Sequence, residues 1–171
     1  NNTLLFSDEM YRFLEYNSRD RLPSACDMYE NAISLFGMSK SFALPGLRIG
    51  WLSSINKKLM NQIAEFKDYT SICNNAPSEI LALIALQNKD KILNRNLQII
   101  ADNIIILNSF FENYKHQFDW YPPQVGPISF TKLNIDIPIS DFCKNLIDKE
   151  QTMLLPASVY GFEGNYFRIG F

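Results

Sequence analysis

Three short apolar segments near the start of the chain, each bordered by polar or turn-forming residues, constrain the fold most strongly. Residues 3–6, 32–36 and 48–52 are too short for ordinary helices and are typical of buried strands. Ser7 and Asp8 directly follow the first segment, and a Gly-Met-Ser-Lys sequence follows the second. Buried strands with polar residues at their ends predict the sheet of an α/β domain.

The middle of the chain has a helical period. Asn56 is a suitable N-cap for a helix through Tyr69, and Pro77 suits the first turn of a helix over residues 78–87. A longer helix is predicted over residues 89–114, because apolar residues recur there at steps of three and four. We interpret them as a core stripe without a cofactor role: Ile92, Leu93, Leu97, Ile100, Ile104, Leu107 and Phe111.

The last part of the chain returns to short apolar segments. Beyond two consecutive prolines we expect strands over residues 128–135, 153–155 and 166–169, and a helix that starts at Ser140 or Asp141 and ends near Lys149. The pattern predicts a small α+β unit. The expected division is a sheet-containing part, connecting helices and this C-terminal unit, over residues 1–55, 56–90 and 91–171.

The composition is that of a globular protein, with 47% hydrophobic and 20% charged residues and a formal net charge of −2. This charge argues against nucleic-acid binding. No apolar segment approaches the roughly 18–20 residues that span a bilayer, and Asn1-Asn2 does not open a signal peptide. We therefore expect a cytoplasmic protein without nucleic-acid or membrane partners.

Metal binding is not expected from the cysteines and the single histidine. Cys26, Cys73 and Cys143 are widely separated, lack metal-ligand spacing and are expected to be reduced structural thiols. His116 has no second histidine with which to share a metal, and we interpret it as a surface or helix-end residue.

The segment Gly37–Gly50 carries the strongest functional signal. It reads Gly-Met-Ser-Lys-Ser-Phe-Ala-Leu-Pro-Gly-Leu-Arg-Ile-Gly. This segment resembles the cofactor-attachment signature of class I/II aminotransferases that depend on pyridoxal 5′-phosphate (PLP), and every constrained position matches. The resemblance implies that Lys40 holds PLP as a Schiff base, that Arg48 binds its phosphate, and that Ser39 lies at the cofactor.

The chemistry suits these residue types. Lysine supplies an amine that can form an imine with an aldehyde and can carry a proton at the substrate α-carbon. Arginine offers a planar fork of donors to a phosphate. One departure concerns Gly37, because many family members have a serine there whose hydroxyl reaches the phosphate. That contact is expected to be lost or replaced by a backbone N–H.

Phe6-Ser7-Asp8-Glu9-Met10-Tyr11 resembles the family's other strand-end motif. The resemblance implies that Asp8 pairs with the pyridinium nitrogen of PLP and that Tyr11 bonds its 3-oxygen. A carboxylate at that nitrogen keeps it protonated, so that the ring can take up electrons released from the substrate. We therefore include Asp8 and Tyr11 with Lys40 as catalytic residues.

The last residues, from Asn165 to Phe171, resemble the family's C-terminal strand, whose arginine grips the substrate α-carboxylate. Arg168 takes that place, and a bidentate arginine–carboxylate pair fixes orientation as well as charge. The preceding segment resembles the family's Pro-Gly-Ser-x-Phe-Gly sequence, with Ala157 in place of glycine and Tyr160 in place of phenylalanine.

The resemblance implies an α/β fold of the aspartate-aminotransferase-like fold type I. The chain is expected to supply part of its PLP-binding large-domain sheet, followed by the small C-terminal α+β domain without its final helix. The family's upstream asparagine loop, stacking aromatic and N-terminal phosphate loop have no counterpart here. The chain is therefore expected to be a fragment that is inactive alone, from a protein that is a homodimer when full length.

The implied function is amino-group transfer between an amino acid and a 2-oxo acid. Two alternatives stay open. The same motifs serve fold type I PLP lyases, decarboxylases and synthases, since they fix the chemistry at the cofactor and not its outcome. Aminotransferase-like domains also act as ligand sensors in transcriptional regulators, which would require a DNA-binding segment that this chain does not contain.

Overall fold

The computed structural model describes residues 3–171 and divides the chain into two compact units. The first unit extends to Leu97, and the second is Gln98–Phe171. Asn1 and Asn2, on which the argument against a signal peptide rests, lie outside the described residues. The three-part domain division expected from the sequence stays a prediction.

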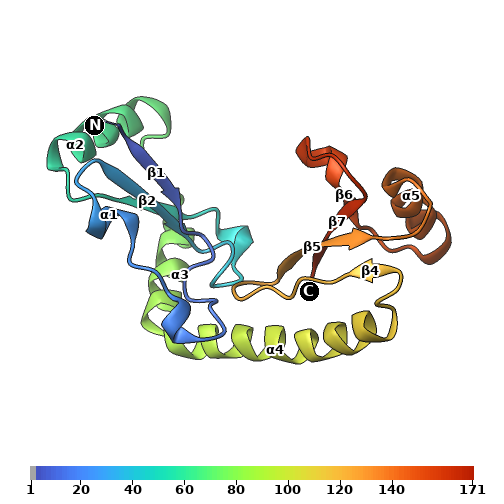
Figure 1. Cartoon of the computed structure of the whole chain (residues 1–171). Helices are drawn as coiled ribbons and strands as arrows, with labels where there is room; N and C mark the ends of the chain where they lie inside the picture. The colour runs from blue at the N-terminus through green and yellow to red at the C-terminus, as the bar shows by residue number, and fades with distance from the viewer. Residues whose placement is uncertain (1–2) are drawn as a thin grey trace. The chain divides into compact units, whose positions relative to one another are not determined.

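The first unit contains a three-stranded sheet in the order β1-β2-β3. Strands β1 (Leu5–Asp8) and β2 (Ala32–Gly37) are parallel, and the connection between them includes the short helix α1 (Ala25–Met28). Strand β3 (Gly50–Ser53) is antiparallel to β2. Figure 1 shows β1 and β2 side by side, with their arrowheads at the same end of the sheet.

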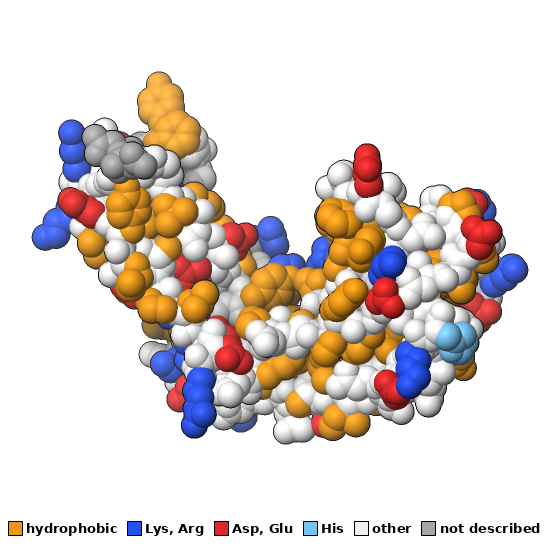
Figure 2. All heavy atoms as spheres, viewed as in Figure 1, with side chains coloured by type: hydrophobic (Ala, Val, Ile, Leu, Met, Phe, Trp, Pro, Cys, Tyr) orange, Lys and Arg blue, Asp and Glu red, His pale blue; other side chains and the backbone are white. Residues whose placement is uncertain are grey.

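The strand predictions hold in type but not in every detail. Strand β1 begins and ends two residues later than expected, so that Asp8 is its last residue. Only β2 is largely buried. The expectation of buried strands is wrong for β1 and β3 of the described chain: Leu5 is 46%, Phe6 is 56% and Trp51 is 37% exposed. Figure 2 shows such apolar side chains on the molecular surface.

Two helices follow the sheet, and both begin at caps visible in the sequence. The side chain of Asn56 accepts a hydrogen bond from the Leu59 N–H and caps α2 (Lys57–Thr70). Asn75 caps α3 (Ala76–Gln87) in the same way, with a proline in its first turn. The core of this unit joins α3 to the loop after β2 through Met38, Phe42, Ala82 and Ala85.

Helix α4 (Lys89–Asn113) contributes residues to both units. Its predicted core stripe is confirmed. Leu93, Ile100 and Phe111 are buried, whereas Ile105 and Ile106 on another face are 68% and 66% exposed. Ile92 of this helix packs against the core of the first unit, and Leu107 and Phe111 belong to the packing of the second.

The second unit contains a four-stranded antiparallel sheet in the order β4-β5-β7-β6. Its strands are Phe118–Asp119, Ile128–Leu133, Leu155–Pro156 and Tyr166–Gly170 for β4 to β7. Helix α5 (Ile139–Glu150) begins one residue earlier than the sequence predicted. The core brings together side chains from α4, β5, α5 and β7, namely Phe111, Leu133, Ile139, Cys143 and Phe167.

Across residues 3–171, no helix combines the length and apolar character that a membrane-spanning segment requires. The architecture is a mixed α/β unit followed by an α+β unit, as the periods of the sequence predict. The feature that matters most for function is the parallel pair β1 and β2, because the carboxyl ends of parallel strands are the usual ligand-binding edge of such sheets.

Candidate active site

Asp8 ends β1 at that edge. Its register partner on β2 is Leu35, so the chain leaves both strands on the same side of the sheet. The Asp8 side chain is exposed and accepts one hydrogen bond, from the backbone N–H of Met10 at 3.1 Å. This carboxylate keeps capacity to accept further hydrogen bonds or to face a cationic ligand atom.

Lys40 lies in the loop that follows β2. Its side chain is exposed, and its Nζ lies 5.9 Å from the centroid of the Tyr11 ring. Within residues 3–171 the Lys40 amine makes no hydrogen bond and no ion pair. The structure therefore brings together two of the residues predicted from separate motifs, and it leaves the amine available for a ligand.

Arg48 closes the same loop in a left-handed backbone conformation, with φ of 52°. One guanidinium nitrogen donates to the Pro45 carbonyl at 3.0 Å, and no carboxylate in the described part of the chain pairs with it. The exposed guanidinium can therefore bind an anion. Ser39 is half-buried, and within residues 3–171 its hydroxyl has no hydrogen-bond partner.

Gly37 has a steric reason for its departure from the family pattern. A Cβ atom at this position would lie 3.0 Å from the Ile49 carbonyl oxygen, 3.0 Å from the Met10 Cε and 3.2 Å from the Gly50 Cα. Gly50 is its register partner on β3. A serine here would have to push the backbone of β3 away from β2. The close packing of these two strands therefore explains why position 37 has no serine hydroxyl.

Glu9 is a residue that the sequence reasoning missed. Its carboxylate accepts hydrogen bonds from the Ser34 hydroxyl at 2.7 Å, the Ser24 hydroxyl at 2.8 Å and the Ala25 N–H at 3.0 Å. The other carboxylate oxygen lies 3.1 Å from an Arg12 guanidinium nitrogen. These contacts join the end of β1 to α1 and β2. Glu9 therefore anchors the turn that begins at Asp8.

The electrostatics of Glu9 fit this role. Burial works to raise the pKa of its carboxyl group. The three hydrogen bonds, with that from Ser34 foremost, and the charge of Arg12 outweigh burial, so the pKa lies below its ordinary value. One signal for this network was available, because Ser34 is a polar residue inside the apolar segment 32–36 and a buried hydroxyl needs a partner.

Arg168 belongs to the second unit, on β7. It lies opposite Phe130 of β5 and Leu155 of β6. One guanidinium nitrogen donates a hydrogen bond to the Tyr160 hydroxyl at 2.9 Å. Tyr160 ends the short 3-10 helix Ala157–Tyr160. No carboxylate pairs with Arg168 in the described part of the chain, so its remaining donors can serve an anionic ligand.

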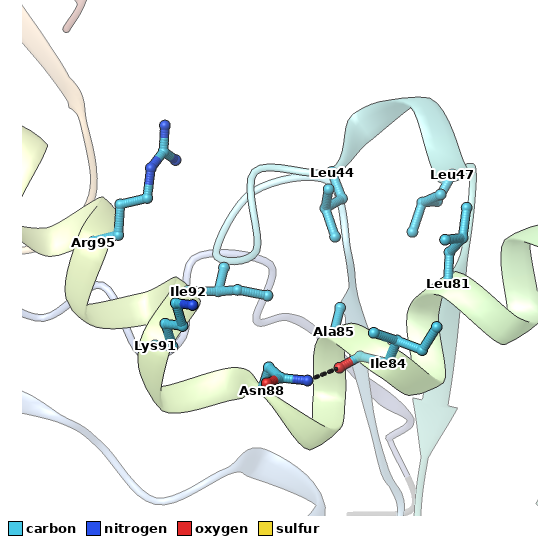
Figure 3. Close-up of a pocket in the computed structure, with 9 residues that line it drawn as sticks. All are labelled: Leu44, Leu47, Leu81, Ile84, Ala85, Asn88, Lys91, Ile92 and Arg95. Carbon is cyan, nitrogen blue, oxygen red and sulfur yellow. Dashed lines mark hydrogen bonds between the residues drawn. The ribbon is translucent and has the colours of Figure 1, made fainter.

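Other candidate features lie apart from these residues. Among residues 3–171 no group of three His, Cys, Asp or Glu side chains could hold a metal ion, and all three cysteines are free. A hollow of about 410 Å³ lies in the first unit, and Figure 3 shows Leu44 and Leu47 of the loop facing side chains of α3 and α4 across it. None of the predicted site residues lines this hollow.

Comparison with known proteins assigns the family. The family described as "Aminotransferase class I and II" matches residues 1–171. The chain therefore belongs to the class I and II aminotransferase family, as the Gly37–Gly50 segment predicted.

Two similar proteins illustrate the range of this family. The HTH-type transcriptional regulator NorG of Staphylococcus aureus (strain N315) is 25% identical over 176 residues, which cover 99% of this chain and 39% of NorG. Capreomycidine synthase of Streptomyces vinaceus is 23% identical over 142 residues, which cover 83% of this chain and 36% of the synthase. The chain spans well under half the length of these relatives.

A solved structure supports the fold. The crystal structure of a PLP-dependent aminotransferase from Streptococcus suis 89-1591 superposes with a TM-score of 0.91 at 31% identity, covering 99% of this chain and 44% of that chain. The prediction of fold type I α/β architecture is thereby confirmed. So is the expectation of pyridoxal 5′-phosphate as the cofactor of the family to which this chain belongs.

Proposed function

We propose that the whole protein is a PLP-dependent aminotransferase that exchanges an amino group between an amino acid and a 2-oxo acid, and that this chain supplies its cofactor lysine. The observation that carries the proposal is the free amine of Lys40, 5.9 Å from the Tyr11 ring centroid. It lies in the loop that follows a parallel strand, next to the strand that ends in Asp8.

The residues of the first unit fit the cofactor. When bound, PLP supplies an aldehyde for imine formation and a pyridine ring that takes up electrons from the substrate. Lys40 offers an unpaired amine for the aldehyde, and Asp8 offers an exposed carboxylate for the ring nitrogen. Arg48 offers a guanidinium without a carboxylate partner for the phosphate. The ring nitrogen and the phosphate of the cofactor thus each have a side chain of opposite charge.

We assign the following roles. Lys40 holds the cofactor and, when released by the substrate, carries a proton at the substrate α-carbon. Asp8 keeps a proton on the ring nitrogen, and the Tyr11 hydroxyl donates to the 3-oxygen. Arg48 binds the phosphate with Ser39 beside it. In the second unit, Arg168 binds the substrate α-carboxylate through the donors that Tyr160 leaves free.

The activity is proposed for the whole protein, acting as a homodimer. We propose that residues 1–171 alone do not turn over, because these residues span only 44% of the Streptococcus suis aminotransferase chain. The exposed strand β1 also leaves backbone groups at the sheet edge without a partner within residues 3–171. Such an edge favours association with other chains over a defined active site.

Two alternatives are supported by named relatives. Similarity to capreomycidine synthase favours a PLP-dependent synthase or lyase, and similarity to NorG favours a ligand-sensing domain of a regulator. The residues discussed above serve all three functions, since they bind the cofactor and an amino acid. The 31% identity to the Streptococcus suis aminotransferase, higher than that to either relative, supports amino-group transfer as the first choice.

The test is product analysis with the whole protein loaded with PLP. A panel of amino acids is incubated with and without a 2-oxo acid, and products are identified by mass spectrometry. Amino-group transfer predicts that the oxo acid is required for multiple turnovers and is converted to its amino acid in equal amount. Product formation that does not depend on the oxo acid would support a lyase or synthase instead. Binding without any conversion would support a sensor.

A further inference from the structure

Ser41, the residue after Lys40, makes contacts that the proposed chemistry does not use. Its side chain is buried, and its hydroxyl lies 2.9 Å from the Met10 carbonyl oxygen and 2.5 Å from the Arg12 carbonyl oxygen. A hydroxyl has one proton to donate, so the two carbonyls share it. These carbonyls belong to the residues on either side of Tyr11.

A second contact fixes Ser41 itself. The side-chain amide of Asn96 donates to the Ser41 carbonyl at 2.9 Å, and both residues are buried. Asn96 lies on α4, within the first unit. The loop that carries Lys40 and the turn that carries Tyr11 are thus joined to each other, and the loop is joined to a helix.

The space around this contact is filled. The gap between the turn and the loop, bordered by Ser41, Phe42, Gly37 and Met10, has a volume of only about 10 Å³. A single water needs at least that much room, and it also needs polar partners of its own. With the Ser41 side chain in place, the gap has room for at most about one water, so the contacts of the two carbonyls with the loop come from the Ser41 hydroxyl itself.

We propose that Ser41 is a positioning residue that sets the Tyr11 ring relative to the Lys40 amine. The inference rests on the proposed function, in which Tyr11 donates to the 3-oxygen of PLP. Ser41 is covalently bonded to Lys40 and is hydrogen-bonded to both neighbours of Tyr11. The Lys40 amine and the Tyr11 hydroxyl therefore keep a fixed relative position before any ligand binds. Such preorganisation limits the ordering that binding would otherwise require.

The experiment is a double-mutant cycle in the whole protein, with the pH midpoint of the bound cofactor's visible absorption band as the readout. Tyr11→Phe removes the proposed donor to the 3-oxygen and should shift the midpoint. Ser41→Ala should shift it in the same direction by about 0.3–1 pH unit, a roughly two- to tenfold change in proton affinity. In the Tyr11→Phe background, Ser41→Ala should cause no further shift, because the group through which it acts is gone.

Matched variants separate positioning from general stability. Ser129 in the second unit is also buried, and its hydroxyl donates to the Tyr121 carbonyl at 2.7 Å. Ser129→Ala should leave the midpoint unchanged. Ser41→Cys keeps the size of the side chain and a weak donor, and it replaces Ser41→Ala in the cycle if the alanine variant does not fold. Hydrogen exchange of cofactor-free protein should show faster exchange over residues 10–14 in the Ser41 variant only.

The outcomes are distinguishable. The positioning role would be overturned if Ser41→Ala shifted the midpoint by the same amount in the wild-type and Tyr11→Phe backgrounds. It would also be overturned if Tyr11→Phe shifted the midpoint clearly and Ser41→Ala did not shift it at all. Either result leaves the proposed function intact. Failure of the wild-type protein to show any cofactor band at Lys40 would instead overturn the proposed function.

Discussion

The proposed cofactor residues of the first unit lie in a strand end, a turn and a loop, whereas Arg168 of the second unit lies within a strand. In the first unit, polar side chains hold the irregular backbone, with the half-buried Glu9 and the buried Ser41 as the main anchors. In the second unit, the antiparallel ladder holds the Arg168 backbone, and within residues 3–171 its side chain donates one hydrogen bond, to the Tyr160 hydroxyl. Loops require many polar anchors to become rigid, and a strand position requires few.

The difference predicts where substitutions act. In the first unit, residues that never touch a ligand should matter for the position of those that do. In the second unit, the effect should be confined to Arg168 and its immediate partner. Substitutions in the whole protein can break or support this contrast.

Asp8→Asn should leave PLP bound and reduce kcat by about 10²–10³-fold, the usual scale for loss of one electrostatic stabiliser of a transition state. The amide cannot keep a proton on the ring nitrogen. Cofactor content and kcat are measured together, with Asp68→Asn on the exposed face of α2 as the control. Turnover within threefold of wild type would show that Asp8 does not face the ring nitrogen.

Glu9→Gln should lower the free energy of unfolding by about 2 kcal/mol, because a half-buried carboxylate that accepts three hydrogen bonds loses its charge. Urea unfolding at pH 7 measures this, and Glu65→Gln, exposed on α2, serves as the control. An equal effect of the two variants would show that the Glu9 network does not anchor the turn.

The pH dependence of Glu9 has a defined sign. Since its folded-state pKa lies below the ordinary value of 4.5, its contribution to stability is present above pH 4.5 and is lost as the pH falls through the folded-state pKa. In Glu9→Gln, the free energy of unfolding should therefore fall less steeply than in wild type as the pH is lowered below 4.5. If the free energy of unfolding fell equally steeply in both proteins, other carboxyl groups would be responsible for the loss of stability in acid.

Arg168→Lys should raise KM for amino acids by about tenfold and change the affinity for PLP by much less, since lysine keeps the charge but not the planar fork. Steady-state kinetics and cofactor titration measure the two quantities. A loss of cofactor affinity as large as the loss in KM would move Arg168 from the substrate site to the phosphate site.

Tyr160→Phe should have the smallest effect, raising KM by about threefold, because one neutral hydrogen-bond acceptor of Arg168 is lost. Phenylalanine also restores the residue type of the family pattern and keeps the aromatic contact with Phe130. Tyr166→Phe is the control, since within residues 3–171 its hydroxyl has no hydrogen-bond partner although its ring stacks on Phe130. Equal effects of both variants would remove any special role of the Tyr160 hydroxyl.

Much of the fold could be predicted from local signals. The cap at Asn56, the proline in the first turn of α3 and the periodic apolar stripe of α4 all lie within a few residues of what they determine, whereas the cap at Asn75 was missed and α3 begins two residues earlier than predicted. The loop proposed to hold the cofactor was recognisable as a motif because its residues are contiguous in the sequence. Local interactions determine these features, and the sequence displays them directly.

The features that were missed depend on residues distant in the sequence. The Glu9 network needs Glu9 and Ser34 brought together by the β1–β2 pairing, and the Ser41 contacts join residues about thirty positions apart. Phe13 and Ala43 adopt positive φ angles of 77° and 54° without being glycine, so no residue type announces them. Tertiary contacts impose these conformations, and local propensity does not encode them.

The central claim is that Lys40 holds the cofactor, and the most direct test is borohydride reduction of the PLP-loaded whole protein followed by peptide mapping. Reduction makes the lysine–cofactor bond permanent, so that mass spectrometry can locate it. The account predicts a phosphopyridoxyl group on Lys40 and its absence from that peptide in the Lys40→Ala variant, which should also lose the visible band. A reduced cofactor found stoichiometrically on Lys57, Lys58 or another lysine in the wild-type protein would contradict the account.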